Sequence, residues 1–202
     1  MILNKFIVFE GIDGAGTSTQ IKLLAKKNPV LFEATCEPTK NETGKFLRRM
    51  LSGEFHVDEK TNAFLFAADR CEHIYGKNGI IDTINQGKIV LSDRYLFSSL
   101  AYQSISVEEI LPKLLNSTFP LPQILFYFKI DPEISLARVN ARDGKKEIYE
   151  KIDLQKKIAQ MYDKIISEYE QTQKEMKIVT IDAALPIKKI EEQIYSYVKN
   201  LY

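Results

Sequence analysis

Short apolar runs alternate with helical stretches along the chain, and this alternation limits the possible folds more than any other feature. Each run is about 3–6 residues long, is rich in branched or aromatic side chains, and lacks the polar–apolar alternation of a half-exposed strand. Because buried strands that alternate with helices form parallel sheets covered on both faces, the sequence predicts an α/β fold. The predicted strands are Phe6–Phe9, Val30–Phe32, Lys88–Leu91, Ile124–Phe128 and Lys177–Ile181.

Helical patterns fill much of the chain between these strands. Residues 18–26 and 149–170 are predicted helices, and Asp131 before Pro132 combines a capping carboxylate with a proline that suits the first helical position. No repeat, low-complexity tract or linker divides the chain, so we expect one domain over residues 1–202. A last helix is predicted behind Pro186 by apolar residues at helical spacing: Ile187, Ile190, Ile194, Val198 and Leu201.

The stretch GIDGAGTST, residues 11–19, differs at one position from the phosphate-binding pattern G-x-x-x-x-G-K-[ST]. Gly11, Gly16 and Ser18 match the pattern, but Thr17 stands where the lysine should be. The stretch joins the first strand to a helix, which is the context that aims backbone N–H groups and a helix N-terminus at a phosphate. A glycine turn without a ligand is the alternative, so nucleotide binding needs support from other segments.

Two further segments supply candidate ligand-binding residues. Asp93 and Arg94 follow the third strand, where an acidic residue suits Mg²⁺ and an arginine suits phosphate oxygens. Phe66 and Arg70 lie four residues apart on one helical face, and they suit stacking on a base and donating to its carbonyl. The alternatives are a helix cap with a surface arginine for the first pair and core packing for Phe66.

Five segments, in this order and spacing, resemble thymidylate kinase over essentially the whole chain: FEGIDGAGTSTQ, EPTKNETGKFLRRML, FLFAADRCEH, SDRYLFSSLAYQ and DPEISLARVNAR. The resemblance implies a P-loop kinase fold with a five-stranded parallel sheet and a small helical lid at about residues 138–151. It also implies transfer of the γ-phosphoryl group of ATP to dTMP for dTTP synthesis, with Mg²⁺, by a homodimer.

The resemblance further implies which residues form the site. The dTMP-binding set is Asp13, Glu37, Pro38, Arg48, Phe66, Arg70, Arg94, Ser98, Ser99, Tyr102 and Gln103. The ATP-binding set is Gly11, Asp13, Gly14, Ala15, Gly16, Thr17, Ser18, Thr19 and Arg138. The catalytic set is Asp13, Arg94, Arg142, Lys145 and Lys146, and the metal ligands are Ser18 and Asp93.

The chain departs from the family pattern at phosphate-contacting positions. Thr17 replaces the loop lysine, Cys36 replaces an arginine, and Lys145 and Lys146 stand where many bacterial members have a lid arginine. Losing one charged hydrogen bond costs roughly 1.5–3 kcal/mol, or about 10–150-fold, if nothing replaces it. Lys40 or the lid lysines are candidates for that charge. A non-catalytic nucleotide-binding or regulatory protein, or a kinase for another nucleotide, therefore remains the alternative.

Composition adds limits on partners and location. The net charge of +1 predicts no overall affinity for nucleic acid or for an anionic membrane. No segment approaches the ~18 continuous apolar residues of a membrane helix. Two cysteines, Cys36 and Cys71, do not form a disulfide framework, so we expect a reducing, cytoplasmic location.

Overall fold

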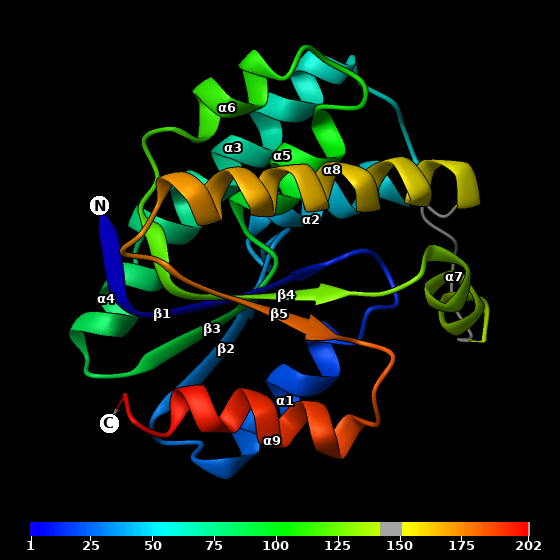
Figure 1. The fold of residues 1–202 in the computed structure, drawn as a ribbon. Coiled ribbons are helices and arrows are strands. Elements are labelled where there is room, and N and C mark those ends of the chain that lie inside the picture. The colour runs from blue at the N-terminus through cyan, green and yellow to red at the C-terminus, as the bar shows by residue number, and fades with distance from the viewer. Residues whose placement is uncertain (142–150, 202) are drawn as a thin grey trace.

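The computed structural model describes residues 1–141 and 151–201, and this part of the chain contains one sheet of five strands (Figure 1). The strand order is β2-β3-β1-β4-β5, and every neighbouring pair is parallel. The predicted five-stranded parallel sheet is therefore confirmed. The strands are β1 (Ile2–Gly11), β2 (Phe32–Cys36), β3 (Ile89–Asp93), β4 (Leu121–Lys129) and β5 (Lys177–Asp182).

The strand order places a topological switch point between β1 and β3. From β1 the chain passes to the edge strand β2, returns to β3 beside β1, and then crosses to β4 on the other side of β1. The carboxyl ends of β1 and β3 are adjacent, with Phe9 in register with Asp93. Ligands of open α/β sheets bind at such a point. The glycine stretch after β1 and the acidic residue at the end of β3 therefore meet where a ligand is expected.

Helices cover both faces of the sheet, which buries residues 6–9 of β1 completely (Figure 1). On one face lie α1 (Thr17–Lys27) and α9 (Ile187–Val198), and on the other lie α3 (Glu59–Tyr75), α5 (Leu96–Gln103) and α8 (Ile152–Thr172). In α9 the apolar face predicted from the sequence is buried at Ile190, Ile194 and Val198. The other helices are α2 (Glu42–Leu51), α4 (Ile80–Asn85), α6 (Ile110–Asn116) and α7 (Pro132–Asn140).

Among the described residues the predicted helices are confirmed, and one predicted strand is displaced. The helix predicted at 149–170 begins at Ile152 behind its N-cap Lys151, and residues 149 and 150 lie outside the described residues. The Asp131 carboxylate caps α7 by accepting the N–H of Glu133 at 2.7 Å, as the sequence predicts. The strand predicted at Val30–Phe32 is wrong in position, because Val30 and Leu31 lie in a turn that is closed by the N–H groups of Leu31 and Phe32, which donate to the Asn28 carbonyl. The strand follows at Phe32–Cys36 instead. Its sequence FEATC is less apolar than the central strands because β2 is an edge strand, and the prediction followed hydrophobicity.

Within residues 1–141 and 151–201, no helix combines the length and the apolar character that crossing a membrane would require.

Candidate active site

The glycine stretch forms a tight loop between β1 and α1. Gly14 and Gly16 have φ angles of +87° and +100°, a region in which a residue with a Cβ is strained. A Cβ on Gly14 would also lie 2.5 Å from the carbonyl oxygen of Ser135, so the loop requires glycine there for two independent reasons. The loop ends at Gly16, the N-cap of α1, and Thr17 is the first helical residue. A helix N-terminus presented by a glycine loop is a favourable place for phosphate oxygens.

Ser18 and Asp93 meet at the adjacent ends of the loop and β3. The Ser18 hydroxyl donates to Oδ2 of Asp93, and both residues line a cavity of about 320 Å³, which is called the main cavity below. A hydroxyl and a carboxylate are oxygen ligands, which Mg²⁺ prefers, and Mg²⁺ in phosphotransferases is held by few protein ligands and by substrate phosphates. The pair therefore fits the predicted metal role, although among the described residues no three His, Cys, Asp or Glu side chains cluster around a common point.

The main cavity has a volume of about 320 Å³, within the range of small-molecule sites. It lies between the glycine loop, the segment after β2, and helices α2, α3 and α5. Three lining residues, Cys36, Leu51 and Tyr95, were not predicted as ligand-binding from the sequence. The remaining lining residues comprise the two predicted metal ligands and the complete predicted dTMP-binding set: Asp13, Ser18, Glu37, Pro38, Arg48, Phe66, Arg70, Asp93, Arg94, Ser98, Ser99, Tyr102 and Gln103.

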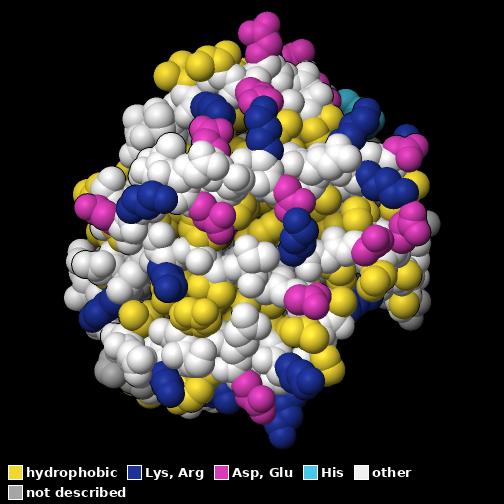
Figure 2. Space-filling model, in the orientation of Figure 1, with side chains coloured by type: hydrophobic (Ala, Val, Ile, Leu, Met, Phe, Trp, Pro, Cys, Tyr) yellow, Lys and Arg dark blue, Asp and Glu magenta, His cyan; other side chains and the backbone are white. Residues whose placement is uncertain are grey.

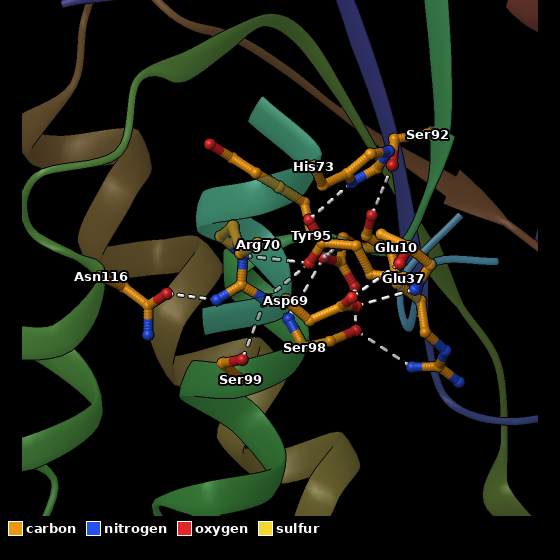
Figure 3. Close-up of polar contacts among 12 residues, drawn as sticks. Glu10, Glu37, Asp69, Arg70, His73, Ser92, Tyr95, Ser98, Ser99 and Asn116 are labelled. Carbon is orange, nitrogen blue, oxygen red and sulfur yellow. Dashed lines mark hydrogen bonds and ion pairs between the residues drawn. The ribbon is translucent and has the colours of Figure 1, made fainter. Parts of the chain in front are cut away.

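At one end of this cavity, a buried ion pair holds Arg70 (Figure 3). Its Nε and Nη2 donate to Oε2 of Glu37 at 3.0 and 2.7 Å, and Nη2 also donates to Oγ of Ser99 at 3.0 Å. The other carboxylate oxygen of Glu37 lies 3.0 Å from Nδ1 of His73. Arg70 is only 1% exposed. Because buried charges need partners, Glu37 and Ser99 fix the guanidinium at the cavity wall.

Two residues that were not predicted complete this end of the site. Nη1 of Arg70 donates to Oδ1 of Asn116, whose own Nδ2 donates to the Pro112 carbonyl at 2.8 Å. The Asp69 carboxylate accepts the N–H of Thr39 at 2.7 Å and so holds the segment after Pro38 against α3. Of these two residues, only Asp69 lies in a segment that the sequence analysis singled out, FLFAADRCEH. Asn116 lies 46 residues from Arg70, and no local pattern connects the two.

The wall formed by α5 contains a polar atom without a partner. Ser99 and Gln103 are both 3% exposed, and Oε1 of Gln103 has no hydrogen-bond partner among the described residues. Phe66, on α3, lines the same cavity and is partly buried against the small apolar cluster that contains Leu51. A buried, unpaired oxygen costs about 1–3 kcal/mol. A ligand that brings a donor into the cavity would recover this cost.

Arg94 lies at the other end of the cavity, close to the glycine loop. Its φ of 72° is unusual for a residue other than glycine, and such strain is concentrated at functional sites. Its Nη2 donates to Oδ1 of Asp13 and, at 3.3 Å, to the hydroxyl of Tyr102. Burial by itself lowers the pKa of Arg94, but Tyr102, Asp13, Tyr162 and Glu10 raise it well above its ordinary value. Arg94 is therefore a permanent cation. Nη2 of Arg48, across the cavity on α2, donates to the Pro38 carbonyl.

A second cavity of about 270 Å³ lies on the other side of the glycine loop. Arg138 lines it, and its Nη1 donates to the Ala183 carbonyl at 3.0 Å. The sequence prediction missed the wall that follows β5, which includes Leu185 and Ile187. Five predicted ATP-binding residues line this cavity: Gly14, Ala15, Gly16, Thr19 and Arg138. Of the remaining predicted ones, Gly11 ends β1, Asp13 lies in the loop, and Thr17 and Ser18 begin α1. The predicted catalytic residues Arg142, Lys145 and Lys146 lie outside the described residues.

A third cavity, of about 380 Å³, adjoins the main one and shares Ser18, Cys36 and Asp93 with it. Lys22 and Lys40 line it, and neither forms an ion pair with any other described residue. Two lysines are thus available next to Ser18 and Asp93.

The strand order, the glycine loop at the switch point and the Ser18–Asp93 pair define the chain as a P-loop nucleotide kinase. The comparison with known proteins gives the family: the model of the family described as thymidylate kinase matches residues 9–194, and the chain belongs to this family.

The alignments with these relatives cover most of this chain and most of each relative. A Treponema pallidum protein and a Methanocaldococcus jannaschii protein, both provisionally named thymidylate kinase, are 41% and 40% identical to the chain. The first alignment covers 98% of this chain and 96% of the relative, and the second covers 100% and 99%. The thymidylate kinase of a Leptospira interrogans strain is 43% identical over 80% of this chain and 81% of its own.

These matches confirm the predicted family, the predicted P-loop kinase fold and the predicted class of enzyme, a transferase that phosphorylates dTMP with ATP as the phosphoryl donor. The alternative of a non-catalytic nucleotide-binding protein is not favoured.

Proposed function

We propose that the chain transfers the γ-phosphoryl group of ATP to dTMP, with dTMP in the main cavity and ATP on the glycine loop. The observation that carries this proposal is the convergence of the whole predicted dTMP-binding set on one cavity whose wall holds the unpaired Oε1 of Gln103. The second cavity, on the opposite side of the loop, leaves room for the donor nucleotide.

The proposed base contacts use donors and acceptors of complementary kinds. Thymine has an N3–H donor between two carbonyl acceptors. Gln103 supplies an acceptor for N3–H, and Arg70, held by Glu37, Ser99 and Asn116, has one remaining N–H, on Nη1, for a carbonyl. Phe66 supplies the apolar face on which the ring stacks. In this arrangement Glu37 orients Arg70 and does not need to contact dTMP itself.

The proposed sugar and phosphate contacts lie toward the loop. Tyr102 packs its ring edge-on against Tyr162 and fills the space of a 2′-hydroxyl, while Asp13 accepts the 3′-hydroxyl. Arg48 and Arg94 face the cavity as cations for the dTMP phosphate. The phosphate is already an anionic nucleophile, so the transfer requires positioning and charge neutralisation, and no general base.

Ser18 and Asp93 would hold Mg²⁺, because their oxygens converge beside the loop. When bound, the ion would neutralise charge on the phosphates of the donor. The missing lysine charge at Thr17 would be supplied by the lid residues Arg142, Lys145 and Lys146, by Arg94, and by Lys40 with its neighbour Lys22.

Assembly and location are also proposals. We infer a single domain over residues 1–202, because all the strands of the described part join one sheet. A homodimer is supported by exposed apolar side chains four residues apart on α6, namely Ile110 and Leu114. A cytoplasmic location is supported by Cys36 and Cys71, which are both free thiols. On the face drawn in Figure 2, cationic and anionic side chains are interspersed, which argues against a basic nucleic-acid surface there.

The test is a coupled ADP-release assay with ATP, Mg²⁺ and dTMP, compared with dUMP, dCMP and thymidine as acceptors. We expect ADP release that depends on dTMP and a clear preference for dTMP over the three others. Release without acceptor measures ATP hydrolysis and is subtracted. No transfer to dTMP at any enzyme concentration would refute the proposal, and equal use of dCMP would refute the proposed base contacts.

A further inference from the structure

Glu10 is a fully buried carboxylate that the mechanism above does not use. It is the penultimate residue of β1, it directly follows the buried residues 6–9, and it is 0% exposed. Burying an unpaired charge is strongly unfavourable, so such a side chain needs several partners. Glu10 accepts four hydrogen bonds, two at each carboxylate oxygen.

One carboxylate oxygen caps the helix that carries the proposed base and sugar contacts (Figure 3). Oε1 of Glu10 accepts the N–H of Tyr95 at 2.7 Å and the N–H of Ser98 at 3.1 Å. These donors belong to the N-terminus of α5, whose N-cap residue provides no side-chain cap of its own. A carboxylate from β1 therefore satisfies the Tyr95 amide and shares the Ser98 amide with the Tyr95 carbonyl, at the helix end where negative charge is favourable. α5 carries Ser99, Tyr102 and Gln103 further along.

The other carboxylate oxygen reaches the phosphate-binding end of the site. Oε2 of Glu10 accepts the hydroxyl of Ser98 at 2.7 Å and the hydroxyl of Tyr162 at 2.8 Å. Nη1 of Arg94 in turn donates to the Ser98 hydroxyl at 3.0 Å. Glu10 thus links, through one side chain, the strand that leads into the glycine loop, the α5 wall and the Arg94 guanidinium.

We propose that Glu10 is a positioning residue for dTMP, whose carboxylate holds the start of α5 and, through Ser98, the Arg94 guanidinium in the geometry that receives the nucleotide. This inference rests on the proposed function, because it concerns the same cavity. It adds a requirement that the carboxylate be ionised, since all four partners donate to it.

The charged and titratable groups around Glu10 make its ionisation state sensitive to pH. Burial raises the pKa of Glu10 to about 7, against the effects of the Ser98 hydrogen bond and of Arg94. The pKa values of the nearby phenols of Tyr95, Tyr102, Tyr127 and Tyr162 are all raised, first of all by burial, so these phenols stay neutral. Arg94 is then the cation that faces Glu10 from the β3–α5 connection, and Asp13 is the other anion beside it.

Protonation of Glu10 rearranges this network. A proton on Oε2 has to be donated to one of the two hydroxyls that now donate to it, and these hydroxyl oxygens lie 2.8 Å apart. The direction of one hydrogen bond reverses, and the Ser98 hydroxyl no longer connects Arg94 to a negatively charged carboxylate. The neutral amide of Glu10→Gln has the same shape and produces the same loss at every pH. The variant therefore mimics the acid form of the protein.

The test measures the KM for dTMP of the wild-type protein and of Glu10→Gln between pH 5.5 and 8.5. We expect the ratio of the two KM values to be near one at pH 5.5 and to rise to about tenfold above pH 7.5, as for the loss of a charged hydrogen bond. Titration of the dTMP phosphate cancels in this ratio. The KM for ATP should change little. Glu33→Gln changes a half-exposed carboxylate of the edge strand β2, which pairs with Lys88 and does not line the main cavity; it is the control and should leave the ratio at one throughout.

Three results would overturn the proposal. A ratio above one that does not vary with pH would indicate a merely structural residue, and a fall in the KM for dTMP would mean that the carboxylate only repels the phosphate. A ratio of one at all pH values in an active enzyme would mean that Glu10 has no role in binding. Loss of transfer in the wild-type protein itself would instead refute the proposed function.

Tyr162→Phe and hydrogen exchange keep the proposal testable if Glu10→Gln folds poorly. Tyr162→Phe removes a hydrogen bond that lowers the pKa of Glu10. The pH midpoint of the KM for dTMP should therefore lie at higher pH in this variant than in the wild-type protein. In the same pH range, the backbone amides of Tyr95 and Ser98 should be less protected on the acid side, once each exchange rate is divided by the intrinsic rate at that pH. An unmoved midpoint together with pH-independent protection of these amides would contradict the inference.

Discussion

Phe66→Ala tests whether the aromatic side chain on α3 binds the base of dTMP. Phe66 is partly buried, and its ring lines the main cavity on one side and contacts the cluster of Leu47, Met50 and Leu51 on the other. Base–aromatic stacking contributes about 1–3 kcal/mol by alanine substitution. Since 1.4 kcal/mol is a factor of ten, we expect the KM for dTMP to rise about 5–150-fold with the KM for ATP nearly unchanged.

The same substitution also has a cost in folding stability, which must be measured separately. A fully buried Phe→Ala change costs about 3–5 kcal/mol, and the partial burial of Phe66 puts its cost in the lower part of that range or below it. Urea unfolding measures this loss, and the kinetic assay is then run at a temperature where both proteins stay folded. A stability loss does not by itself raise one KM selectively.

Phe64→Ala is the matched control for this experiment. Phe64 lies two residues earlier on α3 and is 55% exposed, so it is directed away from the cavity lining. We expect its KM for dTMP to match that of the wild-type protein. If Phe66→Ala raised both KM values equally, or if Phe64→Ala had the same effect, Phe66 would be a packing residue and the proposed base contact would be wrong.

Three further predictions concern the sugar, the loop and acid stability. Ribo-TMP should be a much poorer substrate than dTMP, and Tyr102→Phe should keep most of that discrimination, because the ring stays in place while the hydroxyl loses its long hydrogen bonds of 3.3 and 3.4 Å to Arg94 and Asp13. Equal use of both sugars would remove Tyr102 from the site. Changing Lys145 and Lys146 together to alanine should lower kcat more than it raises the KM for dTMP, and Thr17→Lys should restore part of the loss. Additive effects in the double-mutant cycle would mean that the two lysines do not replace the missing charge at Thr17. Because the pKa of Glu10 is raised from 4.5 to about 7 on folding, its contribution to stability is present below pH 4.5 and is lost as pH rises through 7, by on the order of 3 kcal/mol. Urea unfolding from pH 4.5 to 8 should show this loss in the wild-type protein relative to Glu10→Gln, and parallel stability curves would contradict it.

Local patterns in the sequence determined the parallel sheet and the glycine loop. Buried strands, a capped α7 and the apolar face of α9 follow from side-chain periodicity within a few residues. The positive φ angles of Gly14 and Gly16 are likewise possible because of the residues at those positions alone. The displaced strand β2 is the instructive failure, because an edge strand takes part of its stability from pairing with β3, and its own composition does not reveal that pairing.

The resemblance of five segments predicted which residues line the cavity but not what each side chain does there. Glu37 was predicted as a dTMP-binding residue, and in the structure its carboxylate is occupied by Arg70 and His73. The partner of Arg70 on α6, Asn116, could not be inferred, because hydrogen bonds of side chains 46 residues apart leave no periodic pattern.

Glu10 shows most clearly what only the tertiary structure decided. In the sequence it is one acidic residue between an apolar run and a glycine, equally compatible with a solvent-exposed strand end. Its burial, and its contacts with residues 85, 88 and 152 positions away, arise only when α5 and α8 pack on the sheet. A carboxylate changes its pKa and its role with the solvent and donors around it, and these are properties of the packed chain, because they depend on distances that no local sequence pattern specifies.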